Sequence, residues 1–113
     1  MTIKRFETGP RMSQAVAHNG TLYIAGQVAT GASVKVQTAA ILKQVDALLA
    51  AAGTDKTKVL SATIYLVSVS TFAEMNSAWE AWVSPGNTPA RATVEAKLVA
   101  PEYLVEIALI AAL

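Results

Sequence analysis

The segment SQAVAHNGTLYIAGQVA, residues 13–29, contains two alternating apolar runs on either side of Asn19-Gly20. An Asn-Gly pair between two such runs is a strong signal for a β-hairpin, because both residues tolerate the positive φ angles of a tight turn. Gly26 interrupts the second run, and a glycine inside a strand often marks a bulge or a close approach to the backbone. The second run predicts a buried strand face made of Leu22, Ile24 and Val28.

Two amphipathic helices are predicted further along the chain. Residues 31–53 carry apolar side chains at the i, i+4, i+7 and i+8 spacing of a helix, and Gly53 suits its C-terminal cap. A second apolar stripe begins at Thr71 and Glu74, which have the spacing of a capping box, and stops before Pro85-Gly86. Each helix has only one apolar side, so each is expected to cover one face of a sheet.

Further strands are predicted on both sides of these segments. Residues 1–7 alternate in polarity and suit a short edge strand, and residues 88–113 supply two final strands broken at Ala100-Pro101. Between the helices, residues 58–69 have one apolar face and one mixed face, and the mixed face resembles the lining of a site. The apolar face is expected to consist of Leu60, Ala62, Ile64 and Leu66, and the mixed face of Ser61, Thr63 and Tyr65.

The order β-β-α-β-α-β-β predicts an α+β fold, with a mixed sheet and two helices packed on one face. With 113 residues, the chain is expected to form a single domain, residues 1–113. Apolar residues make up 53% of the chain and charged residues 15%, which leaves few charges to cover the second face of the sheet. We therefore expect that face to pack against copies of the same chain in a closed ring.

Composition excludes several classes of function. The chain has no cysteine and a single histidine, His18, so thiolate chemistry, disulfides and multi-histidine metal sites are not expected. Its formal net charge is +1, with no basic stripe suited to nucleic acid. No apolar segment reaches transmembrane length, and the first ten residues lack the apolar run of a signal peptide. We therefore expect a cytoplasmic protein without a nucleic-acid or membrane partner.

Two charges stand in segments that otherwise suit burial. Arg91 opens a predicted strand, and Glu106 interrupts an apolar run near the C-terminus. A guanidinium matches a carboxylate with two parallel hydrogen bonds, so Arg91 is a candidate ligand for a small acid. A structural ion pair is the alternative for both, for example Arg91 with Glu95, or Glu106 with a cation across a subunit interface.

The ordered motifs GTLYIAGQVA, AAG, VLSATIYL, FAEMN, PARATVEA and VEIALIA resemble the RidA/YjgF/YER057c/UK114 family over nearly the whole chain, and its short-loop subgroup in particular. The resemblance implies a chorismate-mutase-like fold and a homotrimer with three sites in the clefts between subunits. It also implies hydrolysis of enamines and imines, such as 2-aminoacrylate, to 2-keto acids and ammonia without a cofactor or metal.

The resemblance also assigns roles to individual residues. Arg91 in PARATVE matches the arginine that holds the substrate carboxylate, and Glu106 in VEI matches the acid that positions water. Met12 stands where the family usually has a tyrosine, and Thr93 where it commonly has a cysteine. The expected site residues are Arg91 and Glu106 as catalytic residues, with Met12, Gly26, Asn76 and Thr93 lining the same cleft.

The expected function is that of a cofactor-independent deaminase acting on 2-aminoacrylate-type or 2-imino acids, with a small carboxylate-bearing imine, enamine or keto acid as its ligand. Two alternatives stay open. One is a trimer that binds keto acids without turning them over, which the loss of the tyrosine hydroxyl at Met12 favours. The other is a ribonuclease or translation inhibitor, which the absence of a cationic groove disfavours.

Overall fold

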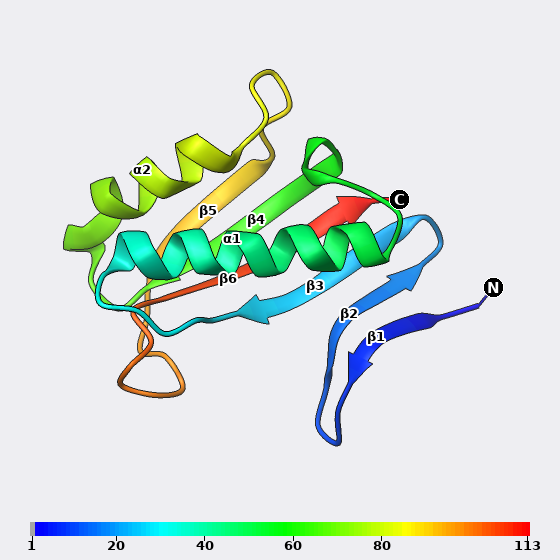
Figure 1. The fold of residues 1–113 in the computed structure, drawn as a ribbon, viewed down its shortest axis with the longest axis horizontal. Coiled ribbons are helices and arrows are strands. Elements are labelled where there is room, and N and C mark those ends of the chain that lie inside the picture. Colours follow the sequence, from blue (N-terminus) through cyan, green and yellow to red (C-terminus); the bar gives the residue numbers. More distant parts are fainter. Residues whose placement is uncertain (1) are drawn as a thin grey trace.

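In a computed structural model of the protein, which describes residues 2–113, one six-stranded mixed sheet carries two helices on the same face (Figure 1). The strand order is β1-β2-β3-β6-β4-β5, and only the β4–β5 pair is parallel. The elements are β1 (Lys4–Thr8), β2 (Ser13–His18), β3 (Thr21–Gln27), α1 (Val34–Ala51), β4 (Val59–Leu66), α2 (Phe72–Trp82), β5 (Ala90–Glu95) and β6 (Val105–Ala112). The predicted α+β arrangement is confirmed, and the edge strand makes the full order β-β-β-α-β-α-β-β.

The predicted hairpin joins β2 to β3 through a two-residue turn. Asn19 and Gly20 have φ angles of 53° and 78°, as a type I′ turn requires. Strand β1 pairs with the outer side of β2, from Lys4 opposite Ala17 to Thr8 opposite Ser13. We call residues 4–18 the β1–β2 arm, and its closed end projects away from the rest of the sheet (Figure 1).

A bulge at Ala25 and Gly26 changes the predicted face of β3. The register with β6 shifts between Ile24 and Gln27. Because the bulge adds a residue, the side chain of Gln27 turns to the buried face and is only 6% exposed. Val28, which was predicted to continue that face, is only partly buried. The bulge predicted at Gly26 is therefore present, and the prediction for Val28 has to be corrected.

A second register shift corrects the predicted face of β4. It lies between Val59 and Ser61, opposite β6. Val59 is buried at 5% exposure, whereas Leu60 is 53% exposed. Strict alternation from Ala62 and Ile64 predicts that Leu60 points into the core. Because the start of the strand is irregular, the Leu60 side chain points to solvent instead.

The helices pack against the sheet as their apolar stripes predict. Helix α1 begins after Ser33, whose hydroxyl accepts a hydrogen bond of 3.2 Å from the Val36 N–H. Trp79 and Trp82 of α2 are buried, and their ring centroids lie 5.4 Å apart. The indole Nε1 of Trp82 donates to Oδ1 of Asp46 on α1 at 3.0 Å, so the two helices are joined by a polar contact as well as by packing.

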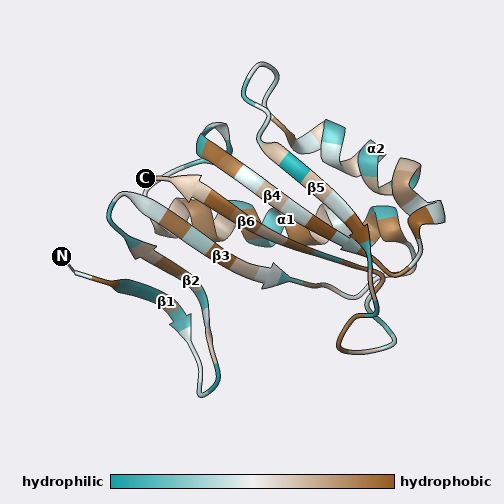
Figure 2. Cartoon of the chain, turned by 180° about the vertical axis from the view of Figure 1, so that it is seen from behind, coloured by the Kyte–Doolittle hydropathy of each residue, from teal (hydrophilic) through white to brown (hydrophobic). Residues whose placement is uncertain are grey.

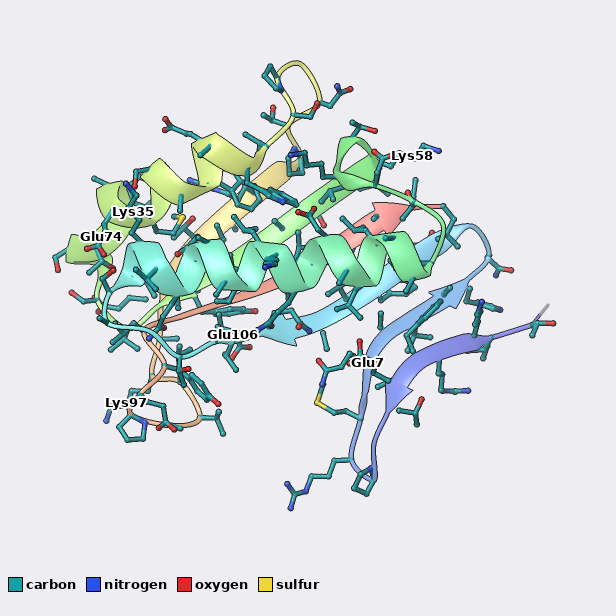
Figure 3. The ribbon with its side chains drawn as sticks, viewed as in Figure 1. Glu7, Lys35, Lys58, Glu74, Lys97 and Glu106 are labelled. Carbon is teal, nitrogen blue, oxygen red and sulfur yellow. The ribbon has the colours of Figure 1, made fainter. Side chains whose placement is uncertain are left out.

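The predicted capping box at the start of α2 does not form. The Thr71 hydroxyl donates to the carbonyl oxygen of Ser68 at 2.7 Å, and its side chain makes no capping hydrogen bond. Instead, Oε2 of Glu74 accepts the backbone N–H of Lys35 at 2.8 Å, in the first turn of α1. Glu74 and Lys35 lie side by side at that end of the helix (Figure 3). Glu74 therefore stabilises the N-terminus of the neighbouring helix.

The other face of the sheet carries no helix (Figure 2). Several apolar side chains are exposed there, among them the cross-strand pair Tyr23 and Ile110, at 49% and 37% exposure. Ser61, Thr63 and Tyr65 on this face are half-buried. Within residues 2–113, no helix combines the length and the apolar character needed to cross a membrane.

Candidate functional site

Arg91 lies on β5 with its side chain on the helix-covered side of the sheet, in register with the buried Ala62. Its Nη1 donates a 2.7 Å hydrogen bond to Oδ1 of Asn76 on α2. The centre of the guanidinium lies 5.6 Å from the Phe72 ring centroid and 5.4 Å from the Trp79 ring centroid. Two aromatic rings and an amide therefore fix the direction in which the fork points.

The electrostatic environment of Arg91 suits an anion-binding group. Burial lowers the pKa of the guanidinium, and the charge of Glu80 opposes that change. An arginine remains protonated at neutral pH, and Asn76 is neutral, so its partner does not cancel the charge. The alternative pairing with Glu95 is not formed within residues 2–113, where Oε2 of Glu95 accepts the Val69 N–H at 2.9 Å.

Thr93 follows on the same side of β5, in register with Ile64. Its hydroxyl oxygen is buried and, among residues 2–113, finds no hydrogen-bond partner. A buried hydroxyl without a partner is costly, and such an atom calls for an explanation. We refer to Arg91, Asn76 and Thr93 as the arginine group.

Glu106 lies on the opposite side of the sheet. Its neighbours on β6, Val105 and Ile107, are fully buried beneath the helices, so alternation directs Glu106 to the uncovered face. Its carboxylate packs against the backbone of Gly26: a Cβ at that position would stand 2.8 Å from Cδ of Glu106 and overlap with Oε2. Gly26 is thus the close approach that its place in a strand predicts.

A cavity of about 900 Å³ opens beside this carboxylate. Met12, which is 48% exposed, Gly26 and Glu106 all line it. We refer to these three residues as the glutamate group. The other lining residues come from the β1–β2 arm, the end of β3, the middle of α1 and the loop before β6: Glu7, Ser13, Gln14, Ala25, Gln27, Val28, Gln44, Ala47, Leu48 and Val99.

The structure thus sorts the six predicted site residues into two groups that do not meet within one chain. Strand β4 separates β5 from β6, and Arg91 and Glu106 project from opposite faces of the sheet. Along β4, Arg91 is in register with Ala62 and Glu106 with Tyr65, so they are also offset along the strands. The two groups of a single chain therefore do not line one common small-ligand site.

Sequence reasoning missed some of the surroundings of both groups. Phe72 and Trp79 lie in the second predicted helix, where the sequence indicates only an apolar stripe, and both rings also contact Arg91. Glu7 and Gln27 line the cavity beside Glu106. No signal in the sequence marks Glu7, because its contribution depends on how the β1–β2 arm lies relative to α1.

Comparison with known proteins finds one family over nearly the whole chain, both by sequence and by structure. The family model described as endoribonuclease L-PSP matches residues 2–113. The chain is 46% identical over 113 residues to the RutC family protein YoaB of Escherichia coli, covering 99% of each chain. A solved member of the YjgF protein family from Neisseria meningitidis has 49% identity and a TM-score of 0.97, covering 99% of this chain and 95% of that one. The Rid-family protein YyfA from Yersinia pestis has 30% identity and a TM-score of 0.92, covering 99% of this chain and 100% of that one.

Proposed function

The chain belongs to the endoribonuclease L-PSP family, together with the YjgF and Rid proteins, and on that premise we propose that it is a cofactor-independent deaminase of 2-imino acids and enamines. Its substrate class is a small carboxylate-bearing imine, 2-aminoacrylate being the simplest enamine form. The products are a 2-keto acid and ammonia. Arg91 holds the carboxylate, and Glu106 positions the attacking water.

One observation carries the proposal: an aromatic-framed guanidinium and a carboxylate packed on a glycine lie at opposite faces of the same sheet. The first has donors for the carboxylate end of an imino acid. The second has acceptors for the water and the nitrogen at its other end. A homotrimer in which the arginine group of one subunit faces the glutamate group of the next gives three such sites.

Apolar surface on the uncovered face of the sheet supports the association. Tyr23, Ile110 and Val94 are exposed there in the single chain, at 49%, 37% and 44%. Contact with a second copy buries such side chains, with a gain of roughly 25 cal/mol for each Å² of apolar surface removed from water. Formation of the trimer and completion of the site are therefore the same event in this proposal.

The proposed reaction is an ordinary imine hydrolysis. Arg91 fixes the carboxylate, and Glu106 accepts a proton from water as the oxygen attacks the imine carbon. The imine reacts in its protonated form, so the attack turns the C=N bond into a C–N single bond to a neutral amino group. Glu106 then returns its proton to that nitrogen, and the C–N bond breaks to release ammonia as the hydroxyl group gives its proton to Glu106 and the C=O bond forms. The gain required is a few kcal/mol of orientation and proton transfer, within the range of these effects.

The direct test generates an imino acid with an amino-acid oxidase and traps the unhydrolysed part with semicarbazide. The protein is expected to lower the trapped fraction. The Arg91→Ala and Glu106→Gln variants are expected to have at least about tenfold lower activity in this assay, because each loses a charge-assisted contact. Arg5→Ala, which removes an exposed arginine of β1, is the matched control and keeps full activity. Equal trapping with and without the protein would reject the deaminase.

A mixing experiment tests the shared site. Two inactive variants, Arg91→Ala and Glu106→Gln, are unfolded together and refolded as mixed oligomers. If each site takes one group from each of two subunits, about a quarter of the sites in a random trimer recover both groups. Activity therefore returns in the mixture. Mixtures that stay as inactive as the separate variants contradict a site built between copies.

A second candidate is a trimer that binds 2-keto acids without turnover. Met12 favours it, because the thioether lines the cavity where a tyrosine of the family offers a hydroxyl. Calorimetry separates the two candidates. A binder takes up a 2-keto acid through Arg91 while the imine trap is unaffected by the protein.

The family model is named for an endoribonuclease, so cleavage of RNA is a third candidate. RNA incubated with the protein and with Arg91→Ala gives the answer. Cleavage that survives the substitution would support a nuclease with a different site. Intact RNA in both samples leaves the small-molecule candidates.

A further inference from the structure

The cavity beside Glu106 has an acidic wall. Among its lining residues are two carboxylates, Glu7 and Glu106, and no lysine or arginine. The two glutamates lie on either side of the gap between the β1–β2 arm and the end of β3 (Figure 3). Because like charges repel and a hollow concentrates their field, this cavity disfavours the carboxylate of a ligand and favours a cation. The carboxylate belongs with Arg91, and the cavity faces the other end of the ligand.

Gln27 adds a third acceptor to this wall. The side chain is 6% exposed, and its Nε2 donates both to Oε1 of Gln14 at 2.9 Å and to the carbonyl oxygen of Ala25 at 3.0 Å. A backbone carbonyl only accepts, so the bond to Ala25 fixes which end of the amide points there. Within residues 2–113, Oε1 of Gln27 receives no hydrogen bond, although Gln27 lines the cavity. The cavity wall therefore offers hydrogen-bond acceptors to a ligand and no charged donor.

The remaining walls are aliphatic. Leu48 and Ala47 of α1, Val28 after β3 and Val99 before β6 line the same cavity. At about 900 Å³ it is far larger than a three-carbon enamine and lies in the range that holds ligands of many atoms. Aliphatic walls with an acidic end match an alkyl chain that ends in a cation.

We propose that this cavity takes a cationic side chain, so that the preferred substrates are 2-imino acids with an ammonium or guanidinium group on an aliphatic stem. Glu7 is the specificity residue that pairs with this group. The part of the inference that concerns imino acids rests on the proposed function. The fold holds Glu7 in place: its φ is 48°, and the following turn is closed by a 2.8 Å bond from the Gly9 N–H to the Met12 carbonyl.

Binding tests the inference without any requirement for turnover. Calorimetry compares 5-guanidino-2-oxopentanoate with 2-oxohexanoate, a keto acid whose unbranched aliphatic side chain carries no charge. We expect the guanidino acid to bind about tenfold tighter or better, since a charge-assisted hydrogen bond contributes about that much. In Glu7→Gln this preference falls by about tenfold. Glu102→Gln, which removes the same charge from an exposed side chain outside the cavity, keeps it.

The outcomes separate this inference from the proposed function. Equal or weaker binding of the guanidino acid, no binding of either acid, or a preference unchanged by Glu7→Gln would overturn the inference. If selective binding is found and no imino acid is hydrolysed in the trapping assay, the deaminase fails and the cationic pocket stands. If neutral and cationic imino acids are hydrolysed with equal kcat/KM, the deaminase stands and the pocket fails.

Discussion

Asn76 on α2 accepts a 2.7 Å hydrogen bond from Arg91 on β5, so a helix and an edge strand jointly aim the only guanidinium framed by two aromatic rings in the part of the chain described here. Most asparagines on a helix surface are merely solvated, whereas the side chain of Asn76 is hydrogen-bonded to a strand residue. The contact leaves the remaining N–H donors of the fork for a ligand. In the proposed deaminase, Asn76 therefore positions the group that holds the substrate.

Asn76→Ala is expected to weaken keto-acid binding by about tenfold, because the guanidinium loses the partner that fixes its rotamer. Arg91→Ala, which removes the donors themselves, is expected to cost more. Calorimetry measures both. Asn76→Asp is the informative companion: it keeps the acceptor but adds a charge that neutralises Arg91, and it should bind keto acids as poorly as Asn76→Ala or worse. Unchanged affinity in all three variants would remove the arginine group from the site.

Gly26→Ala is expected to lower kcat/KM by roughly a hundredfold with little loss of fold. The added Cβ overlaps with the Glu106 carboxylate, which has to move, and a displacement of about 1 Å in a catalytic group costs on that scale. Gly9→Ala is the matched control, because its Cβ would meet only the Met12 carbonyl oxygen at 3.5 Å. Imine trapping gives the rates, and circular dichroism checks the fold. Full activity in Gly26→Ala would mean that the position of Glu106 is immaterial.

Much of the fold was predictable from the sequence because its main signals are local. The Asn19-Gly20 turn, the helical stripes and the break at Ala100-Pro101 each depend on a few neighbouring residues. The errors arose where a strand departs from strict alternation. Bulges near Gly26 and Val59 turn Gln27 inward and Leu60 outward, and no local pattern fixes the residue at which a register shifts.

The candidate site was predictable only as a set of residues. The motifs identify Arg91 and Glu106, but the two faces of the sheet on which they lie follow from strand order and register. The role of Glu74 shows the same limit. Its spacing from Thr71 suits a capping box, and a tertiary contact with Lys35 takes the carboxylate instead. Contacts between segments far apart in sequence leave no local signature.

Glu74→Ala is expected to lower the free energy of unfolding by about 1 kcal/mol, because the first turn of α1 loses an acceptor and a favourable charge at its N-terminus. Glu74→Gln, which retains an acceptor, should lose about half as much. Urea unfolding followed by circular dichroism measures both values. In a capping box, Thr71 and Glu74 would stabilise the same helix end, and Thr71→Ala would lower the free energy of unfolding as much as Glu74→Ala does. If the losses caused by Thr71→Ala and Glu74→Ala add fully in the double variant, the result supports two separate contacts.

Gln37→Leu is expected to lower the free energy of unfolding by about 2–4 kcal/mol, the cost of leaving buried polar groups without partners. Gln37 is fully buried in α1, and its amide makes three hydrogen bonds to backbone groups of the two loops that flank the cavity: it donates to the carbonyls of Gly31 and Glu102 and accepts the Leu104 N–H, at 2.9–3.1 Å. Urea unfolding gives the value. Gln44→Leu, on the exposed side of the same helix, should stay within about 0.5 kcal/mol of the parent.

The loop before β6 carries Val99 and leads into Glu106, so loss of its anchor should also be visible at the site. At a temperature where Gln37→Leu remains folded, we expect faster hydrogen exchange at Leu104, whose N–H loses its acceptor. Keto-acid affinity should fall with it, because binding then has to order the loop. A variant that loses stability with unchanged exchange at Leu104 would show that Gln37 stabilises the core and not the loop. If both the hydrogen exchange at Leu104 and the keto-acid affinity are unchanged, Gln37 does not hold the loop that forms this wall of the cavity.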